Sequence, residues 1–191
     1  EIVTTAVQLA KSAAKRKPGV RVALDIGPIG ELLEPNGYLP FDDAYDLFAE
    51  QVIVGEKAGA DLIVFETMSD LYEVKAAILA AKEHTRLPVF VTMSFEADHR
   101  TFTGCTTASF ALCAEGLGAD AIGINCSLGP DQILPIAEEL AAMSNLPLII
   151  KANAGLPDPV TNTYSINASG YAQMLTAFTK LPVTYVGGCC G

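Results

Sequence analysis

The sequence predicts an α/β protein, a (β/α)8 TIM barrel that is incomplete in this chain and contains about six β/α units. Six continuous apolar runs alternate with amphipathic helical patterns, which is typical of a parallel sheet with right-handed crossovers. Polar or reactive residues follow one run after another: Asp25, Glu66-Thr67, Ser94-Phe95-Glu96, Asn125-Cys126 and Asn153-Ala154-Gly155. A barrel gathers all of its strand ends around one mouth, whereas a doubly wound sheet would concentrate such residues at one switch point.

The composition excludes several classes of function. Half of the residues are hydrophobic and only 18% are charged, so we expect a folded domain with strands buried on both faces. The net charge of −10 disfavours nucleic acid, whose phosphates require a basic surface. No apolar run reaches the roughly 18 residues of a membrane helix, and no signal segment begins the chain. We therefore expect a cytoplasmic protein that binds neither membranes nor nucleic acid.

The first elements are expected to be a helix over residues 1–17 and a β-branched strand over Val20 to Ile26. A loop over residues 27–40, rich in glycine and proline, follows the strand. Asp42 or Asp43 can cap the next helix, because an aspartate at the N-cap accepts a hydrogen bond from a free backbone N–H group.

Five further strands are expected where an apolar run follows one of two short signals. Gly-Ala-Asp precedes the runs at 62–65 and 121–124, and Leu-Pro precedes those at 89–91, 148–150 and 183–186. Proline is tolerated at the first residue of a strand, so each Leu-Pro indicates where a strand begins.

Amphipathic helices are predicted between these strands. Asp70 is expected to cap one of them, with Glu73 as the acidic partner of a capping box. Gly129-Pro130 begins another, since proline suits the first helical turn. Two more follow i, i+3, i+4, i+7 spacing: Phe110, Cys113, Ala114 and Leu117, and Tyr171, Met174, Leu175 and Phe178.

Six strands cannot close an eight-stranded barrel. The sequence also ends directly after an apolar run, with no helix to cover that strand. We therefore expect residues 1–191 to form one partial barrel domain, whose first two strands and last helix lie outside this chain.

Three of the five cysteines are expected to meet at one zinc ion. Cys126 follows one predicted strand, while Cys189 and Cys190 follow the last strand within Gly-Gly-Cys-Cys-Gly. Strand ends are close neighbours across a barrel mouth, and a zinc site with three protein ligands and an open position is catalytic. The paired Cys-x-x-Cys spacing of a structural zinc finger is absent.

Three thiolate ligands favour one kind of zinc chemistry. Their charge exceeds that of the Zn²⁺ ion, so such a site is a poor generator of hydroxide. It can instead bind a fourth thiol as an electron-rich thiolate, which predicts alkyl transfer to sulfur. Among the other reactive side chains, we expect Cys113 in the core, Cys105 in a loop, and His84 and His99 in solvent.

The cysteine motifs resemble those of the homocysteine S-methyltransferase family of zinc-dependent barrels. The resemblance rests first on Gly187-Gly188-Cys189-Cys190-Gly191 and Gly123-Ile124-Asn125-Cys126-Ser127. Other stretches are most similar to the homocysteine-binding module of the cobalamin-dependent methionine synthases and of bacterial fusions with methylenetetrahydrofolate reductase. They are Asp25-Ile26-Gly27-Pro28, Glu66-Thr67-Met68-Ser69-Asp70, Ser127-Leu128-Gly129-Pro130 and Asn153-Ala154-Gly155.

This resemblance implies a reaction and its cofactors. Cys126, Cys189 and Cys190 would hold zinc, and homocysteine would bind as a zinc-bound thiolate and be methylated to methionine. The methyl group would come from methylcobalamin and methyltetrahydrofolate, so the implied partners are cobalamin- and folate-binding modules or a fused reductase module. No catalytic residue is implied beyond the zinc site.

The resemblance also implies roles for residues in the substrate pocket. Glu66 would receive the ammonium group of homocysteine, unless it forms a structural salt bridge, and Asp25 would lie at the pocket floor. Asn153 would occupy the fourth zinc position in the resting site, or stabilise its own turn. The chain departs from the family at Lys151-Ala152, where an acidic or neutral residue and a proline are expected. This lysine would alter the charge of the pocket or point away from it.

Other functions are compatible with the same cysteines. Enzymes that use betaine or S-methylmethionine as methyl donor share the zinc-binding trio. A thiol or redox domain could use Cys189 and Cys190 without zinc, and a non-catalytic domain could use zinc only to brace the barrel.

Overall fold

The computed structural model describes all residues from Glu1 to Gly191. Six parallel strands form one sheet in the order β1-β2-β3-β4-β5-β6. The strands are β1 Ala23–Ile26, β2 Leu62–Met68, β3 Val89–Met93, β4 Ala121–Asn125, β5 Leu148–Ala152 and β6 Val183–Gly188. The helices are α1 Ile2–Ala14, α2 Phe41–Ala58, α3 Leu71–His84, α4 Thr107–Gly116, α5 Pro130–Met143, α6 Ala168–Leu175 and the 3-10 helix η1 Thr176–Lys180. All six predicted strands are present, and they run parallel, as predicted.

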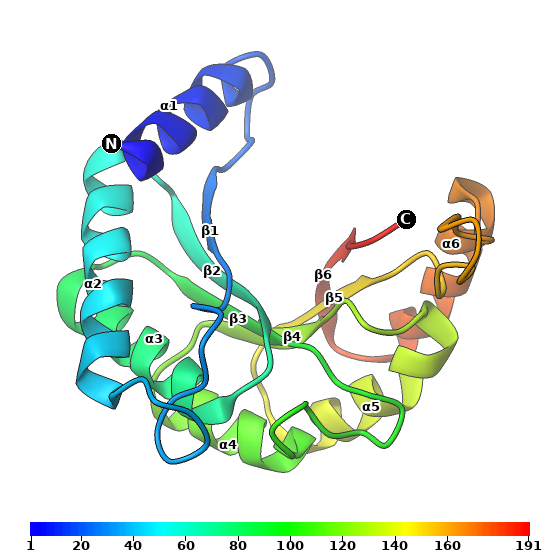
Figure 1. The fold of residues 1–191 in the computed structure, drawn as a ribbon. Helices are drawn as coiled ribbons and strands as arrows, with labels where there is room; N and C mark the ends of the chain where they lie inside the picture. The colour runs from blue at the N-terminus through cyan, green and yellow to red at the C-terminus, as the bar shows by residue number, and fades with distance from the viewer.

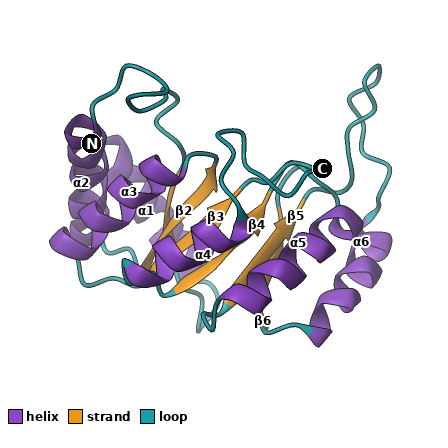
Figure 2. Cartoon of the chain, turned by 90° about the horizontal axis from the view of Figure 1, so that it is seen from below, coloured by secondary structure: helices purple, strands orange, loops and turns teal.

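The sheet curls into part of a barrel with the helices on its outside (Figure 1). Strands β1 and β6 are the two edges, and they do not pair with each other. Figure 2 shows the helices lying along the outer side of the strands. The prediction of an incomplete barrel with six strands is therefore confirmed.

The hydrophobic core lies between the outer face of the sheet and the helices. Side chains alternate between the two faces of a strand, so every second residue points outward. Phe65 of β2 packs edge-on against Phe48 of α2, with ring centroids 5.5 Å apart. Leu24 of β1 lies against Gly55 of α2, where an added Cβ would come within 2.3 Å of the leucine.

The inner, concave face carries a different set of side chains. Phe90 of β3 and Tyr185 of β6 contact each other with ring centroids 4.9 Å apart, although these strands are not neighbours in the sheet. Such a contact is possible because the curl brings distant strands face to face. The concave face is therefore the place where residues from several strands can build one pocket.

The start of α3 confirms one predicted cap and corrects another. The Asp70 side chain accepts a hydrogen bond of 2.8 Å from the Tyr72 backbone N–H, as expected of an N-cap. Glu73 does not complete a capping box. Its buried carboxylate accepts a hydrogen bond from the backbone N–H of Ile29 and so joins α3 to the loop after β1.

Two other helix boundaries differ from the prediction. Helix α1 ends at Ala14, before the predicted end at residue 17. Helix α2 begins at Phe41, so the two aspartates predicted as caps lie inside its first turn, where their charges suit the helix dipole. None of the helices has the length and apolar character needed to cross a membrane.

Candidate metal centre and substrate pocket

Three thiols meet at the carboxyl edge of the sheet. The sulfur atoms of Cys126, Cys189 and Cys190 all lie within 4.8 Å of one another, and those of Cys126 and Cys190 are 3.9 Å apart. Three sulfurs bound at about 2.3 Å to a tetrahedral zinc ion lie roughly 3.8 Å from each other. The three cysteines therefore fit a zinc ion with little rearrangement.

The end of β5 holds the two cysteine segments together. The backbone N–H of Cys126 donates to the carbonyl oxygen of Lys151 at 3.1 Å, and that of Cys189 donates to Ala152 at 3.1 Å. Strand β5 lies between β4 and β6, so consecutive carbonyl groups of one strand position the cysteines of both neighbours. This arrangement explains how thiols two strands apart reach one point.

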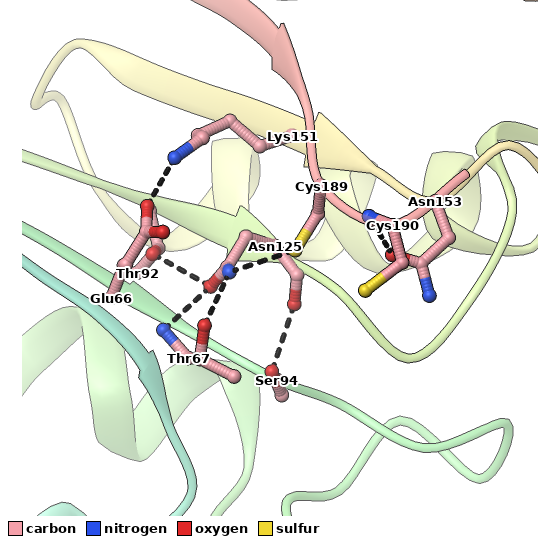
Figure 3. A network of polar contacts seen from close by, with 9 residues as sticks. All are labelled: Glu66, Thr67, Thr92, Ser94, Asn125, Lys151, Asn153, Cys189 and Cys190. Carbon is pink, nitrogen blue, oxygen red and sulfur yellow. Dashed lines mark hydrogen bonds and ion pairs between the residues drawn. The ribbon is translucent and has the colours of Figure 1, made fainter. Parts of the chain in front are cut away.

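Asn153 is buried beside the paired cysteines. Its side-chain oxygen accepts a hydrogen bond of 2.9 Å from the backbone N–H of Cys190, as Figure 3 shows. The carbonyl oxygen of Cys190 in turn accepts a hydrogen bond of 2.8 Å from the backbone N–H of Ala154. Asn153 thus stabilises the backbone of a candidate ligand. Its predicted place as a zinc ligand in the resting site stays a prediction.

The backbone after β4 adopts a left-handed conformation at two consecutive residues. Cys126 has φ 64° and Ser127 has φ 54°, values that are uncommon for residues other than glycine. The backbone N–H of Leu128 donates back to the carbonyl of Cys126 and closes the turn. Left-handed residues of this kind cluster at functional sites, where the surrounding structure maintains them.

Asn125, the last residue of β4, organises the polar contacts beneath the thiols (Figure 3). It is buried, and its oxygen accepts hydrogen bonds of 2.8 Å from the backbone N–H of Thr67 and from the Thr92 hydroxyl. Its amide nitrogen donates to the Thr67 hydroxyl at 2.7 Å and to the sulfur of Cys189 at 3.7 Å. The sequence interpretation included Asn125 only as part of a motif. A buried asparagine directly before a candidate ligand was the available signal.

The surroundings of Cys189 change the pKa of its thiol. Desolvation and the adjacent Cys126 thiol together raise this pKa to about 12, while the Asn125 amide opposes the shift. Sulfurs this close cannot all ionise without a nearby positive charge, because like charges in a low dielectric repel strongly. A bound cation would supply that charge, which agrees with the spacing of the three sulfurs.

A charged cluster lies on the concave face below the thiols. The Lys151 ammonium group of β5 contacts the Glu66 carboxylate of β2 in an ion pair, and both side chains are mostly buried. Desolvation raises the pKa of Asp25, the Glu66 carboxylate raises it further, and Lys151 lowers it. Glu66 therefore forms a salt bridge, the alternative that the sequence left open for it, and Lys151 extends across the concave face toward it.

Tyr171 of α6 joins the ends of the last two strands. Its hydroxyl group lies 2.8 Å from the carbonyl oxygen of Ala152 and 2.7 Å from that of Gly187. The sequence placed Tyr171 only on the apolar face of a helix. The signal that could have found it is the phenol group itself, since a half-buried tyrosine hydroxyl requires a hydrogen-bond partner.

The remaining cysteines and histidines lie away from the metal centre. Cys105 lies in a loop, as predicted, but its side chain is buried, and desolvation raises its pKa to about 11. Cys113 is only half-buried, so its predicted place in the core is wrong. His84 lies 3.0 Å from the hydroxyl of Tyr45, and His99 lies 2.7 Å from a carboxylate oxygen of α5.

A curled parallel sheet with three converging thiols at its carboxyl edge defines a barrel protein with a candidate thiolate metal centre. Comparison with known families makes the assignment specific. The family described as "Homocysteine S-methyltransferase" matches residues 1–191, so the chain belongs to the homocysteine S-methyltransferase family.

Relatives and solved structures agree with this assignment. The chain is 29% identical over 174 residues to a methionine synthase of Mycobacterium leprae and 30% identical over 174 residues to one of Mycobacterium tuberculosis. These matches cover 87% of this chain but only 14% of each relative. The metallated form of the homocysteine methyltransferase MmuM from Escherichia coli superposes with a TM-score of 0.82 at 20% identity, over 98% of this chain and 65% of that chain. The apo form gives a TM-score of 0.78 at 19% identity.

Proposed function

We propose that residues 1–191 form a partial barrel domain that binds zinc and homocysteine within a homocysteine S-methyltransferase of the methionine synthase type. The convergence of the three thiols at the mouth of the sheet carries this proposal. Zinc bound by Cys126, Cys189 and Cys190 would lower the pKa of a substrate thiol, so that the sulfur is a nucleophile near neutral pH.

The residues around the thiols have positioning roles in this proposal. Asn125 fixes the sulfur of Cys189 by its amide N–H, and Asn153 fixes the backbone of Cys190. Hydrogen bonds to ligand atoms of this kind orient the ligands of metal sites and tune their basicity. Glu66 and Asp25 supply negative charge where the ammonium group of an amino-acid substrate would lie.

For the methyl donor we propose methylcobalamin, with methyltetrahydrofolate as the methyl source. The relatives at 29% and 30% identity support this choice, since both are methionine synthases. Betaine and S-methylmethionine are the alternative donors. The cobalamin- and folate-binding modules, or a fused reductase, would then be partners of this domain.

Metal analysis and zinc X-ray absorption spectroscopy test the proposal. We expect stoichiometric zinc whose coordination shell gains one sulfur when homocysteine is added. Cys126→Ala should lose the metal, whereas Cys113→Ala, a matched change on the outer side of the barrel, should keep it. A zinc coordination shell that does not change at saturating homocysteine would show that zinc only stabilises the barrel. Protein that contains no zinc and whose thiol content falls on oxidation would instead indicate a redox domain.

A further inference from the structure

Lys151 reaches across the concave face of the sheet. It lies on β5, and its ammonium group contacts Glu66 on β2, although β3 and β4 separate these strands. Its backbone is paired with Asn125 on one side and Gly187 on the other. A Cβ at Gly187 would lie 3.3 Å from Cγ of Lys151, so the glycine leaves room for the lysine stem. The lysine side chain therefore extends over the concave face in a position that its neighbours permit.

The thiols lie about one layer of side chains above this lysine. Lys151 pairs with Gly187, and Cys189 follows two residues later. Two residues along a strand span roughly 6.6 Å. That length is close to the separation between the sulfur and the amino-acid end of a short thiol amino acid. Glu66 is connected to the same region, because its neighbour Thr67 accepts a hydrogen bond from the Asn125 amide group, which also donates to the sulfur of Cys189. A substrate held at the metal by its sulfur could therefore extend its polar end toward Lys151 and Glu66.

The charged side chains near Lys151 can match the two charges of a zwitterion. Two carboxylates, Asp25 and Glu66, come from β1 and β2, and one ammonium group comes from Lys151. Asp25 pairs with Val64, two residues before Glu66, so the two carboxylates project from neighbouring strands toward the same face of the sheet. A ligand that carries both an ammonium and a carboxylate group can satisfy both signs of charge, whereas a ligand with one of them cannot.

We propose that Lys151 is a specificity residue that exchanges ion-pair partners when the substrate binds. In the empty pocket Lys151 pairs with Glu66. When the substrate enters, its ammonium group takes the place of Lys151 on Glu66, and Lys151 pairs with the substrate carboxylate. The inference rests on the proposed function, and it assigns to Lys151 the selection of thiols that also carry an α-carboxylate.

The exchange leaves the net charge of this cluster unchanged, because the amino-acid end of the substrate is a zwitterion. One ion pair is replaced by two, so neither Glu66 nor Lys151 loses a partner. This matters because an unpaired charge in a mostly buried position is costly. An amine that lacks a carboxylate would compete with Lys151 for Glu66 without supplying the lysine with a new partner, and would bind weakly for that reason.

Binding of three thiols to protein loaded with Co²⁺ tests the exchange. The ligands are homocysteine, 3-aminopropanethiol, which lacks the carboxylate, and 4-mercaptobutyrate, which lacks the amine. Each dissociation constant is measured from the change in the cobalt absorption spectrum, a readout independent of methyl transfer. In the unmodified protein, homocysteine should bind at least roughly tenfold more tightly than either truncated thiol.

Lys151→Met should change the affinities for the two truncated thiols in opposite directions. The amine should bind roughly tenfold more tightly, since Lys151 no longer competes for Glu66, and the carboxylate should bind more weakly. Lys151→Arg should keep the preference for homocysteine. Lys82→Met, which removes a similar ion pair to Asp120 at the opposite end of the barrel, should change none of the three.

Several results would overturn the exchange. If homocysteine and 3-aminopropanethiol bind the unmodified protein equally tightly, this result alone overturns the exchange. If Lys151→Met changes the affinities for both truncated thiols in the same direction, Lys151 has only a structural role. If thiols alter the cobalt spectrum but show no such selectivity, only the exchange fails. If no thiol alters that spectrum, the proposed function fails with it.

Discussion

The two halves of the candidate metal centre stand on very different parts of the molecule. Every residue of β4, which leads to Cys126, is buried, whereas no residue of β6, which leads to Cys189 and Cys190, is buried. Helix α6, which lies beside β6, also has no buried residue, while α5 buries five. Packing of a buried strand therefore supports the first cysteine in addition to its hydrogen bond to β5, whereas the other two depend on hydrogen bonds alone.

Within residues 1–191, the contacts that hold the paired cysteines are hydrogen bonds. The end of β6 and the segment after it are fixed by Asn153, by the carbonyl of Ala152 and by the hydroxyl of Tyr171. Each of these contacts is worth about 1 kcal/mol, far less than a packed strand. A metal bound by all three cysteines would couple the exposed edge to the central strand and stabilise the edge, because metal binding contributes to folding.

A pair of glycine substitutions gives the largest expected contrast between the two regions. In β4, a Cβ at Gly123 would come within 2.0 Å of the carbonyl oxygen of Ile149, so Gly123→Ala forces the central strands apart. In β6, the nearest atom to a Cβ at Gly188 is 3.9 Å away. We expect Gly123→Ala to lower the free energy of unfolding by about 3 kcal/mol or more. Gly188→Ala should change it by less than about 0.5 kcal/mol.

Urea unfolding followed by circular dichroism measures both variants. The Gly188→Ala protein is the matched control, because the same methyl group is added to a strand of the same sheet. Equal losses of stability in the two variants would contradict the distinction between a packed centre and a loose edge.

The sequence was sufficient to predict the strands and the convergence of the three thiols. Strands of a parallel sheet are buried on both faces, so they appear as continuous apolar runs that need no long-range information. The strand rule also predicts the place of Cys126, Cys189 and Cys190, because the carboxyl ends of parallel strands share one edge. The family motif and the geometry agree at these positions.

The contacts across the concave face could not be predicted in the same way. Lys151 and Glu66 are 85 residues apart, and their contact depends on how strongly the sheet curls. The sequence interpretation therefore left the direction of Lys151 open. Helix caps were also uncertain, since Glu73 could bond to its own helix or to a distant loop, and burial against the loop decided between them.

Removing one hydroxyl group tests the hydrogen bonds of the exposed edge. Tyr171→Phe removes the donor that lies between the carbonyl groups of β5 and β6, at a cost of about 1 kcal/mol. We expect zinc to be lost roughly fivefold more readily in competition with a chelator, while the central strands keep their hydrogen-exchange protection. Tyr38→Phe is the control, because Tyr38 is 95% exposed. A uniform loss of protection over the whole sheet would show that the edge and the centre unfold together.

The smallest expected effect on stability comes from the β1 edge of the sheet, opposite β6, where a contact of Asp61 depends on pH. Asp61 accepts hydrogen bonds of 2.6 Å from the backbone N–H of Val22 and 2.9 Å from the Lys11 ammonium group, which join β1 and α1 to the start of β2. The hydrogen bond from Val22 lowers the pKa of Asp61 below its usual 3.8, and Lys11 lowers it further. The folded state therefore favours the ionised form of Asp61 over the protonated form.

A lowered pKa stabilises the folded protein only while the carboxyl group is ionised. The stabilisation is complete above the unfolded pKa of about 3.8 and is lost as the pH falls through the lower folded value. Asp61→Asn should reduce the free energy of unfolding near neutral pH by less than about 1 kcal/mol, since the pair is partly exposed to solvent. Urea unfolding at several pH values should show the two proteins converging only below about pH 3.8. A difference that stays constant into that acidic range would assign the effect to packing of the side chain, and would mean that this edge, unlike the cysteine edge, is not fixed by polar contacts.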